Sequence, residues 1–168
     1  MKLIRQLKMC IDIYYYLMLL TFIVGVVIVI ASFFTTNTYD MEILDESIDV
    51  GVLNVFEKFF ILVSIITVFG VYFSTIRLIK KTVDMLSKGA YFTTHVIKNL
   101  KKIGKLFIIC AFGFLAVKFV VNMILFSEFL IGISSTFMVF LIIGLFMMFL
   151  SEAFSNAKKI KEENDLTV

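Results

Sequence analysis

The stretch IYYYLMLLTFIVGVVIVIASFF, residues 13–34, runs for 22 residues without a charged side chain. A helix rises about 1.5 Å per residue, and the hydrocarbon core of a bilayer is about 30 Å thick, so about 20 apolar residues cross it. This stretch is therefore long enough to span a membrane as one helix. Because it exceeds a signal-peptide core of roughly 7–15 residues and no small-residue cleavage site follows, we expect it to be retained.

Three further stretches have the same character, at residues 59–76, 106–126 and 129–150, and Lys118 is the one charged residue among them. The whole chain is 61% hydrophobic, with a mean hydropathy of +1.03, which is outside the usual range of soluble domains. The sequence predicts an all-α, polytopic membrane protein, a single domain over residues 1–168 with four transmembrane helices in an antiparallel bundle. The expected spans are about 13–34, 57–79, 105–126 and 130–152.

Charge is distributed unevenly between the segments that join these spans. Residues 35–54 carry five acids and no basic residue, whereas residues 77–105 carry eight basic residues and one acid. Because Lys and Arg accumulate in short cytoplasmic segments, we expect both termini in the cytoplasm. The outer acidic segment is then 35–54, the helical basic cytoplasmic loop 80–104, and the cytoplasmic tail 153–168. The net charge of +3 follows from this bias and does not indicate direct nucleic-acid binding.

The basic loop has the signals of two helices with a turn between them. Lys88 and Gly89 predict the end of the first helix, and Thr93 predicts the N-cap of the second, with Phe92 and Ile97 at the spacing of a hydrophobic staple. The second helix has an apolar face opposite its lysines. Such a helix can rest on anionic lipid headgroups or dock a partner protein, and we favour the lipid bilayer as its contact.

Polar residues inside the spans suggest one intramembrane cluster. Lys118 is costly to bury, and it shares a small or polar face of the third span with Gly104, Ala111 and Asn122. The second span has a similar face with Glu57, Ser64, Thr67, Gly70 and Ser74. We hypothesise that the two faces meet, with Lys118 reaching towards Glu57. The pair would either fix the helix register or form a polar site for a ligand, ion or peptide.

No pattern of catalytic or metal-binding residues is evident. His95 has no Cys, Asp or second His nearby, and Glu162, Glu163 and Asp165 are sequential acids of a kind that is usually just solvated. The two cysteines, Cys10 and Cys110, are expected to be unpaired in a reducing compartment. We therefore expect no enzyme activity, no catalytic residues, no metal site and no cofactor.

Two stretches resemble a known family. SKGAYFTTHVIKNLKKIGKLFI, residues 87–108, is similar to the middle loop of small bacterial four-helix membrane proteins classed as a domain of unknown function. The matching residues are Gly89, Phe92, Thr93, Leu100, Ile103 and Gly104, while Tyr91 replaces the family's usual Pro. SEAFSNAKKIKEENDLTV, residues 151–168, is similar to the family's C-terminal end. The matching residues there are Glu152, Phe154, Glu162, Glu163, Asp165, Leu166, Thr167 and Val168.

The resemblance implies a function by association, because proteins of this kind are often encoded beside an Xre-type helix-turn-helix regulator. It predicts a non-enzymatic regulatory or sensor partner of such a cytoplasmic transcription regulator. The docking segment would be the tail (Glu162, Glu163, Asp165, Leu166, Thr167 and Val168). Its last three residues, Leu166, Thr167 and Val168, would form a short apolar, β-prone end. The resemblance also implies a location in the bacterial inner membrane. An immunity protein against a membrane-active peptide is the alternative, followed by a small transporter. Assembly into a homo-oligomer is left open.

Overall fold

The computed structural model describes residues 2–31, 33–34, 40–43, 46–49, 53–125 and 133–166. It contains four long helices: α1 (Lys2–Ala31), α2 (Val55–Ser87), α3 (Thr94–Leu125) and α4 (Ser135–Leu166). All four are long and apolar enough to cross a membrane. The predicted four-helix membrane architecture is confirmed.

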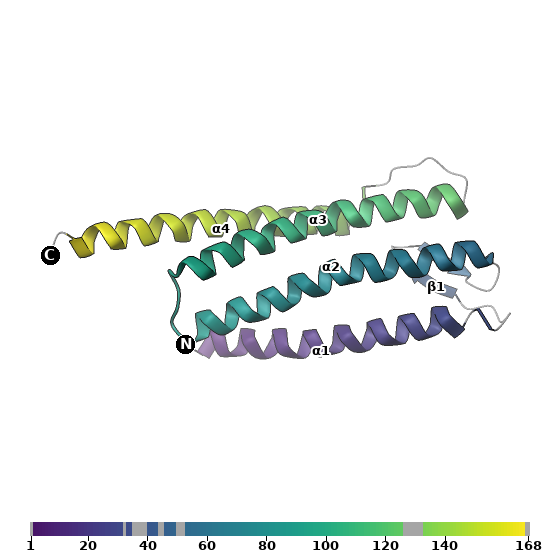
Figure 1. Cartoon of the computed structure of the whole chain (residues 1–168), viewed down its shortest axis with the longest axis horizontal. Coiled ribbons are helices and arrows are strands. Elements are labelled where there is room, and N and C mark those ends of the chain that lie inside the picture. Colours follow the sequence, from purple (N-terminus) through teal and green to yellow (C-terminus); the bar gives the residue numbers. More distant parts are fainter. Residues whose placement is uncertain are drawn as a thin grey trace.

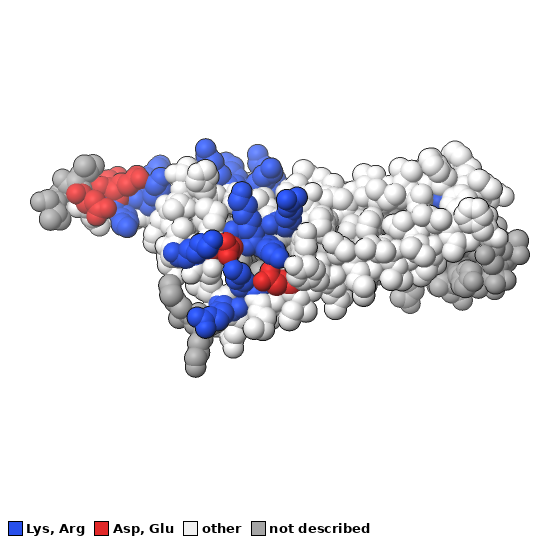
Figure 2. All heavy atoms as spheres, turned by 60° about the horizontal axis from the view of Figure 1, so that its bottom comes forward, with Lys and Arg blue, Asp and Glu red and all other residues white. Residues whose placement is uncertain are grey.

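The helices are antiparallel and pack in chain order (Figure 1). Among the described residues, α1 packs along α2, α2 along α3, and α3 along α4. α1 begins and α4 ends at the same end of the molecule. We call this the basic end, because Lys and Arg gather there (Figure 2), and we call the opposite end the hairpin end.

The helices are longer than a bilayer core requires. They contain between 30 and 33 residues each, which corresponds to about 45–50 Å at 1.5 Å per residue. A hydrocarbon core of about 30 Å leaves roughly 15–20 Å of each helix outside. Since most charged residues of the helices lie towards one end, this excess projects mainly from the basic end.

A β-hairpin at the opposite end is a feature that the sequence analysis did not predict. Strands β1 (Asp40–Ile43) and β2 (Glu46–Asp49) pair antiparallel, with Asp40 opposite Asp49 and Ile43 opposite Glu46. DMEI alternates polar with apolar residues, ESID has one apolar residue, and both are rich in acids. Asp and Glu are depleted in strands, so propensity alone hid the hairpin within the predicted acidic segment.

The core is centred on α3. Among the described residues, more than half of the buried apolar side chains belong to this helix, and α1 contributes few. α3 has a packing neighbour on each side, α2 and α4, whereas α1 contacts only α2 in the described part of the chain. The buried apolar residues of α3 are Val96, Leu100, Ile103, Phe107, Cys110, Ala111 and Val121.

The turn between α2 and α3 follows the prediction. The N–H of Ala90 donates to the carbonyl of Met85 at 3.2 Å and the N–H of Gly89 donates to that of Leu86 at 3.0 Å, which together form a Schellman motif. Gly89 has a φ of 84°, a left-handed conformation that favours glycine. Thr93 caps α3, because its Oγ1 accepts the N–H of Val96 at 3.4 Å. This turn returns the chain into the bundle and places residues 89–93 at the basic end.

Candidate functional site at the basic end of the bundle

Ion pairs join α1 to α2 at the basic end. Asp84 accepts hydrogen bonds from Lys8 on α1 and from Lys88, the latter at 2.8 Å. These two lysines lower the pKa of the Asp84 carboxyl to about 2, and the hydrogen bond from Lys8 has the larger effect. Further along, Lys80 lies 3.0 Å from Asp12. Because these side chains are all partly or largely exposed, the pairs orient the two helices more than they stabilise them.

The α3–α4 contact at this end is much closer. An added Cβ at Gly104 would lie 2.6 Å from the carbonyl oxygen of Gly144, and one at Gly144 would lie 2.9 Å from that of Gly104. Two glycines therefore let the backbones approach. About two helical turns further towards the basic end, the buried hydroxyl of Ser151 donates to the carbonyl of Ile97 at 2.8 Å.

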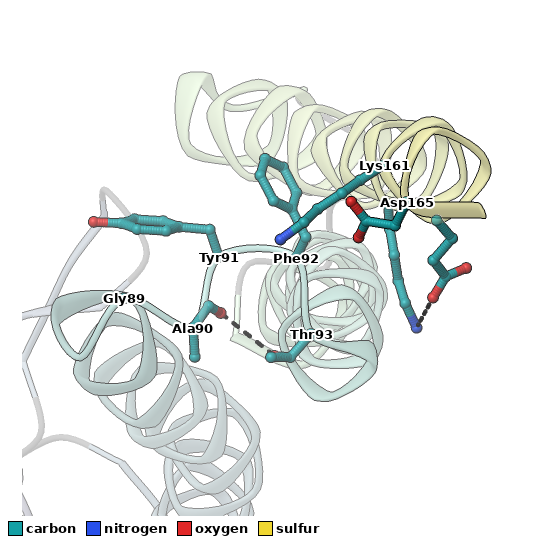
Figure 3. Close-up of a pocket in the computed structure, with 9 residues that line it drawn as sticks. Gly89, Ala90, Tyr91, Phe92, Thr93, Lys161 and Asp165 are labelled. Carbon is teal, nitrogen blue, oxygen red and sulfur yellow. Dashed lines mark hydrogen bonds and ion pairs between the residues drawn. The ribbon is translucent and has the colours of Figure 1, made fainter. Parts of the chain in front are cut away.

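Beyond this crossing, α4 continues past the start of α3 (Figure 1) and forms one wall of a pocket of about 480 Å³. The α2–α3 turn forms the other wall, and Figure 3 shows Lys161 reaching from α4 towards it. Phe92 of the turn contacts Phe154 of α4, with ring centroids 5.7 Å apart. Lys158 donates to Thr94 at 2.7 Å and lies 3.5 Å from Glu162. The lining residues are Gly89, Ala90, Tyr91, Phe92, Thr93, Lys158, Lys161, Glu162 and Asp165.

The pocket joins the two stretches that carry the family resemblance, and comparison with known proteins agrees with that resemblance. The family model "Protein of unknown function (DUF2975)" matches residues 2–168. The chain belongs to the DUF2975 family. No curated protein and no solved structure matches it.

In this DUF2975 protein the loop motif divides into two groups. Gly89, Phe92 and Thr93 line the pocket. Leu100 and Ile103 are buried in the core, and Gly104 makes the close crossing with α4. The first group shapes a surface, and the second group packs the helices that support it.

The predicted docking tail is only partly placed. Glu162 and Asp165 line the pocket, and Glu163 is exposed on the same helix. The sequence analysis expected a β-prone end from Leu166, but α4 continues as a helix through Leu166, and that expectation is wrong at this residue. The acid-rich segment stays helical because its residues extend α4 without a Gly or Pro to stop it. Thr167 and Val168 lie outside the described residues.

One member of the predicted intramembrane cluster, Thr67, does not lie as expected. Thr67 is exposed, and its hydroxyl donates to the carbonyl of Val63 in its own helix at 2.8 Å. Its predicted place in an α2–α3 interface is therefore wrong. The physical reason is that the bond to Val63 satisfies the hydroxyl of Thr67 without a partner on α3. Gly104, from the small face of α3, packs against α4, where Gly144 permits a close approach. Ser64, on the same helix as Thr67, is half-buried.

The other members of the cluster have separate environments. Glu57 accepts the N–H of Asn54 at 2.8 Å and so caps the start of α2. Lys118 is half-buried, and its pairing with Glu57 stays a prediction. Asn122 is buried, and its Oδ1 has no hydrogen-bond partner in the described part of the DUF2975 chain.

Sequence reasoning missed three contributors at the basic end. Gly144 was not singled out, although a glycine flanked by large apolar residues in a span is a sign of close helix approach. Asp12 and Asp84 were also overlooked as organisers, although each is an acid in a strongly basic part of the sequence. Among the described residues, no group of three or more His, Cys, Asp or Glu could hold a metal ion.

Proposed function

We propose that this DUF2975 protein is a non-enzymatic regulatory or sensor partner of a cytoplasmic helix-turn-helix transcription regulator, which it docks at the basic end of the bundle. The observation that carries the proposal is the pocket between the α2–α3 turn and the end of α4. It is built from two stretches, far apart in the chain, that resemble the corresponding parts of the family.

The proposal places the basic end in the cytoplasm and the hairpin end outside, with the protein in the bacterial inner membrane. Its support is the positive-inside rule: Lys and Arg gather at the end of the molecule where α1 begins and α4 ends (Figure 2). The hairpin strands at the other end carry Asp40, Glu42, Glu46 and Asp49 and no basic residue. A soluble regulator would then meet the pocket directly.

The pocket suits a protein partner in size and chemistry. A volume of about 480 Å³ lies within the usual range for binding pockets and holds a few side chains of a docked segment. Its α4 wall offers both signs of charge, with Lys158, Lys161, Glu162 and Asp165, while Phe92 adds apolar surface. Aromatic side chains are enriched at protein interfaces, and polar groups form their rim.

The test is co-purification of the full chain with the helix-turn-helix regulator encoded by the adjoining gene. We expect the regulator to be retained by the wild type and lost on deletion of residues 159–168. Glu162→Lys should weaken retention at least about tenfold by reversing a charge in the pocket. Glu152→Lys is the matched control, because Glu152 is exposed on the same helix but does not line the pocket.

Two results would overturn the docking proposal. One is retention of the regulator by the truncated chain. The other is equal weakening by Glu152→Lys and Glu162→Lys, since a specific pocket distinguishes the two positions on α4. Circular dichroism and a single peak in size-exclusion chromatography check that each variant remains folded.

The second candidate is an immunity protein against a cationic, membrane-active peptide. The observation that favours it is the acidic hairpin formed by β1 and β2 at the opposite end of the molecule. This candidate predicts that cells expressing the chain survive such a peptide, and that replacing the hairpin acids Asp40, Glu42, Glu46 and Asp49 with Asn or Gln removes the protection. Protection that persists without these acids would reject it.

A further inference from the structure

The start of α1 carries two adjoining cavities that the docking proposal does not use. The larger, of about 370 Å³, is lined by Arg5, Lys8, Met9, Asp12, Ile13 and Tyr16. The smaller, of about 270 Å³, is lined by Ile4, Arg5, Lys8 and Ser87, so it lies between α1 and the end of α2. Arg5 and Lys8 border both cavities, so positive charge is concentrated where the two meet.

The charge around these cavities remains positive after the local acids are counted. Lys88 and Lys8 share the carboxylate of Asp84, and Lys80 pairs with Asp12. Four cations therefore face two carboxylates on the two helices, and the surplus favours an anion. The groups are Arg5, Lys8, Lys80, Lys88, Asp12 and Asp84.

The larger cavity changes from charged to apolar along the helix. Met9, Ile13 and Tyr16 follow one another at helical spacing and are 60%, 59% and 65% exposed. From Arg5 to Tyr16 is 11 residues, or about 16 Å at 1.5 Å per residue. Because the expected first span begins at residue 13, Arg5 and Lys8 lie at the level of the headgroups, whereas Ile13 and Tyr16 lie at the start of the hydrocarbon core. The surface thus follows a lipid from its headgroup into the first part of its acyl chain.

We propose that this surface is a binding site for one anionic phospholipid, which we call the α1 lipid site. The phosphate lies at Arg5 and Lys8, and an acyl chain runs along Met9, Ile13 and Tyr16. Charge complementarity selects an anionic headgroup over a zwitterionic one, because cations near a membrane surface attract anionic lipids. A lipid here would brace the α1–α2 pair, in which α1 has no other packing neighbour among the described helices.

The site is tested with the full chain in detergent micelles by native mass spectrometry. Phosphatidylglycerol and phosphatidylcholine with identical acyl chains are added at equal concentration, and the fraction of protein with lipid bound is measured. We expect several-fold more phosphatidylglycerol than phosphatidylcholine. Arg5→Gln should lower phosphatidylglycerol retention about fivefold, the loss expected for one cation near the membrane surface. Arg77→Gln removes the same charge from an exposed residue outside both cavities and should change retention less than twofold.

A second variant tests the acyl groove without changing charge. Ile13→Ala should lower phosphatidylglycerol retention, whereas a site that reads only the phosphate would be unaffected. The proposal is overturned if Arg77→Gln acts as strongly as Arg5→Gln, if both lipids are retained equally, or if Ile13→Ala has no effect. It is also overturned if 10 mM inorganic phosphate displaces the lipid, since the site would then serve a soluble anion. These outcomes are independent of regulator binding.

Discussion

The glycine pair at the α3–α4 crossing provides the sharpest quantitative test of this structure. Replacing Gly104 with Ala adds one methyl group, which would lie 2.6 Å from the carbonyl oxygen of Gly144 and 3.0 Å from the backbone nitrogen of Met148. The side-chain Cγ of Met148 also lies 2.6 Å away and could move, but the other two obstructing atoms belong to backbone, so no rotamer change removes the clash. Only a shift of α3 relative to α4 can do so.

The size of the effect follows from the shortfall in distance. Ordinary van der Waals contact for such a carbon begins at 3.4 Å, so the methyl group at Gly104 is about 0.8 Å too close. Overpacking of this kind typically lowers the free energy of unfolding by about 1–3 kcal/mol. Because 1.4 kcal/mol is a factor of ten, we expect the ratio of folded to unfolded protein to fall roughly 5- to 150-fold.

The measurement is reversible unfolding in mixed detergent micelles, with SDS as denaturant and helicity followed by circular dichroism. Gly113→Ala is the matched control, because Gly113 lies on the same helix and an added Cβ there meets no atom within 4 Å. That control should be neutral or up to about 1 kcal/mol more stable, since Ala has the higher helix propensity.

The double variant provides an internal check on the geometry. Gly104→Ala and Gly144→Ala push the same two backbones apart, so the second substitution should cost less in the presence of the first. A Gly104→Ala chain as stable as the Gly113→Ala chain would refute the close crossing. Strict additivity of the two glycine substitutions would contradict a shared contact.

The remaining predictions concern the basic end. Gly89→Ala should lower the free energy of unfolding by about 1–2 kcal/mol, because alanine is strained at the φ of 84° that Gly89 adopts. An added Cβ meets no atom within 4 Å, so backbone strain is the whole effect. An unchanged unfolding midpoint would reject this strain argument. Ser151→Ala should cost about 1 kcal/mol through loss of the bond to Ile97, and Ser151→Thr, which keeps the hydroxyl, is the informative comparison. Asp84 lies beyond the apolar part of α2, and its pKa is lowered to about 2, chiefly by Lys8. The stability that the ionised Asp84 carboxylate adds to the folded protein is therefore present above about pH 4 and is lost as the pH falls towards 2. Asp84→Asn should therefore flatten the stability profile in that window, and a wild-type profile already flat there would count against the pairing.

Local signals in the sequence predicted several parts of the candidate site correctly. Lys88 and Gly89 were expected to end a helix, and the Schellman hydrogen bonds form there. Thr93 was expected to cap the next helix, and its hydroxyl does so. These features depend on residues within one turn of each other, so the local sequence is sufficient to specify them.

The choice of contacting helix faces was not predictable in the same way. The second span offered Ser64 and Thr67 as a small, polar face, yet Thr67 is exposed and bonded within its own helix. Gly104 packs against Gly144 instead. In a membrane, lipid covers apolar faces as well as another helix does, so helix pairing is decided by how closely backbones can approach. How closely two backbones approach depends on one residue from each helix together, here Gly104 and Gly144.

Hydropathy and charge, read from the sequence by itself, determined that this chain is a four-helix membrane protein with one basic end, because crossing a bilayer depends on the length and polarity of each segment alone. Only the tertiary structure decided that the α2–α3 turn and the end of α4 share one pocket. It also decided that α3 is the central helix and that ion pairs at the start of α1 orient it against α2. The physical reason is that these features arise where helices of fixed length overlap, and their relative shifts follow from packing between distant residues.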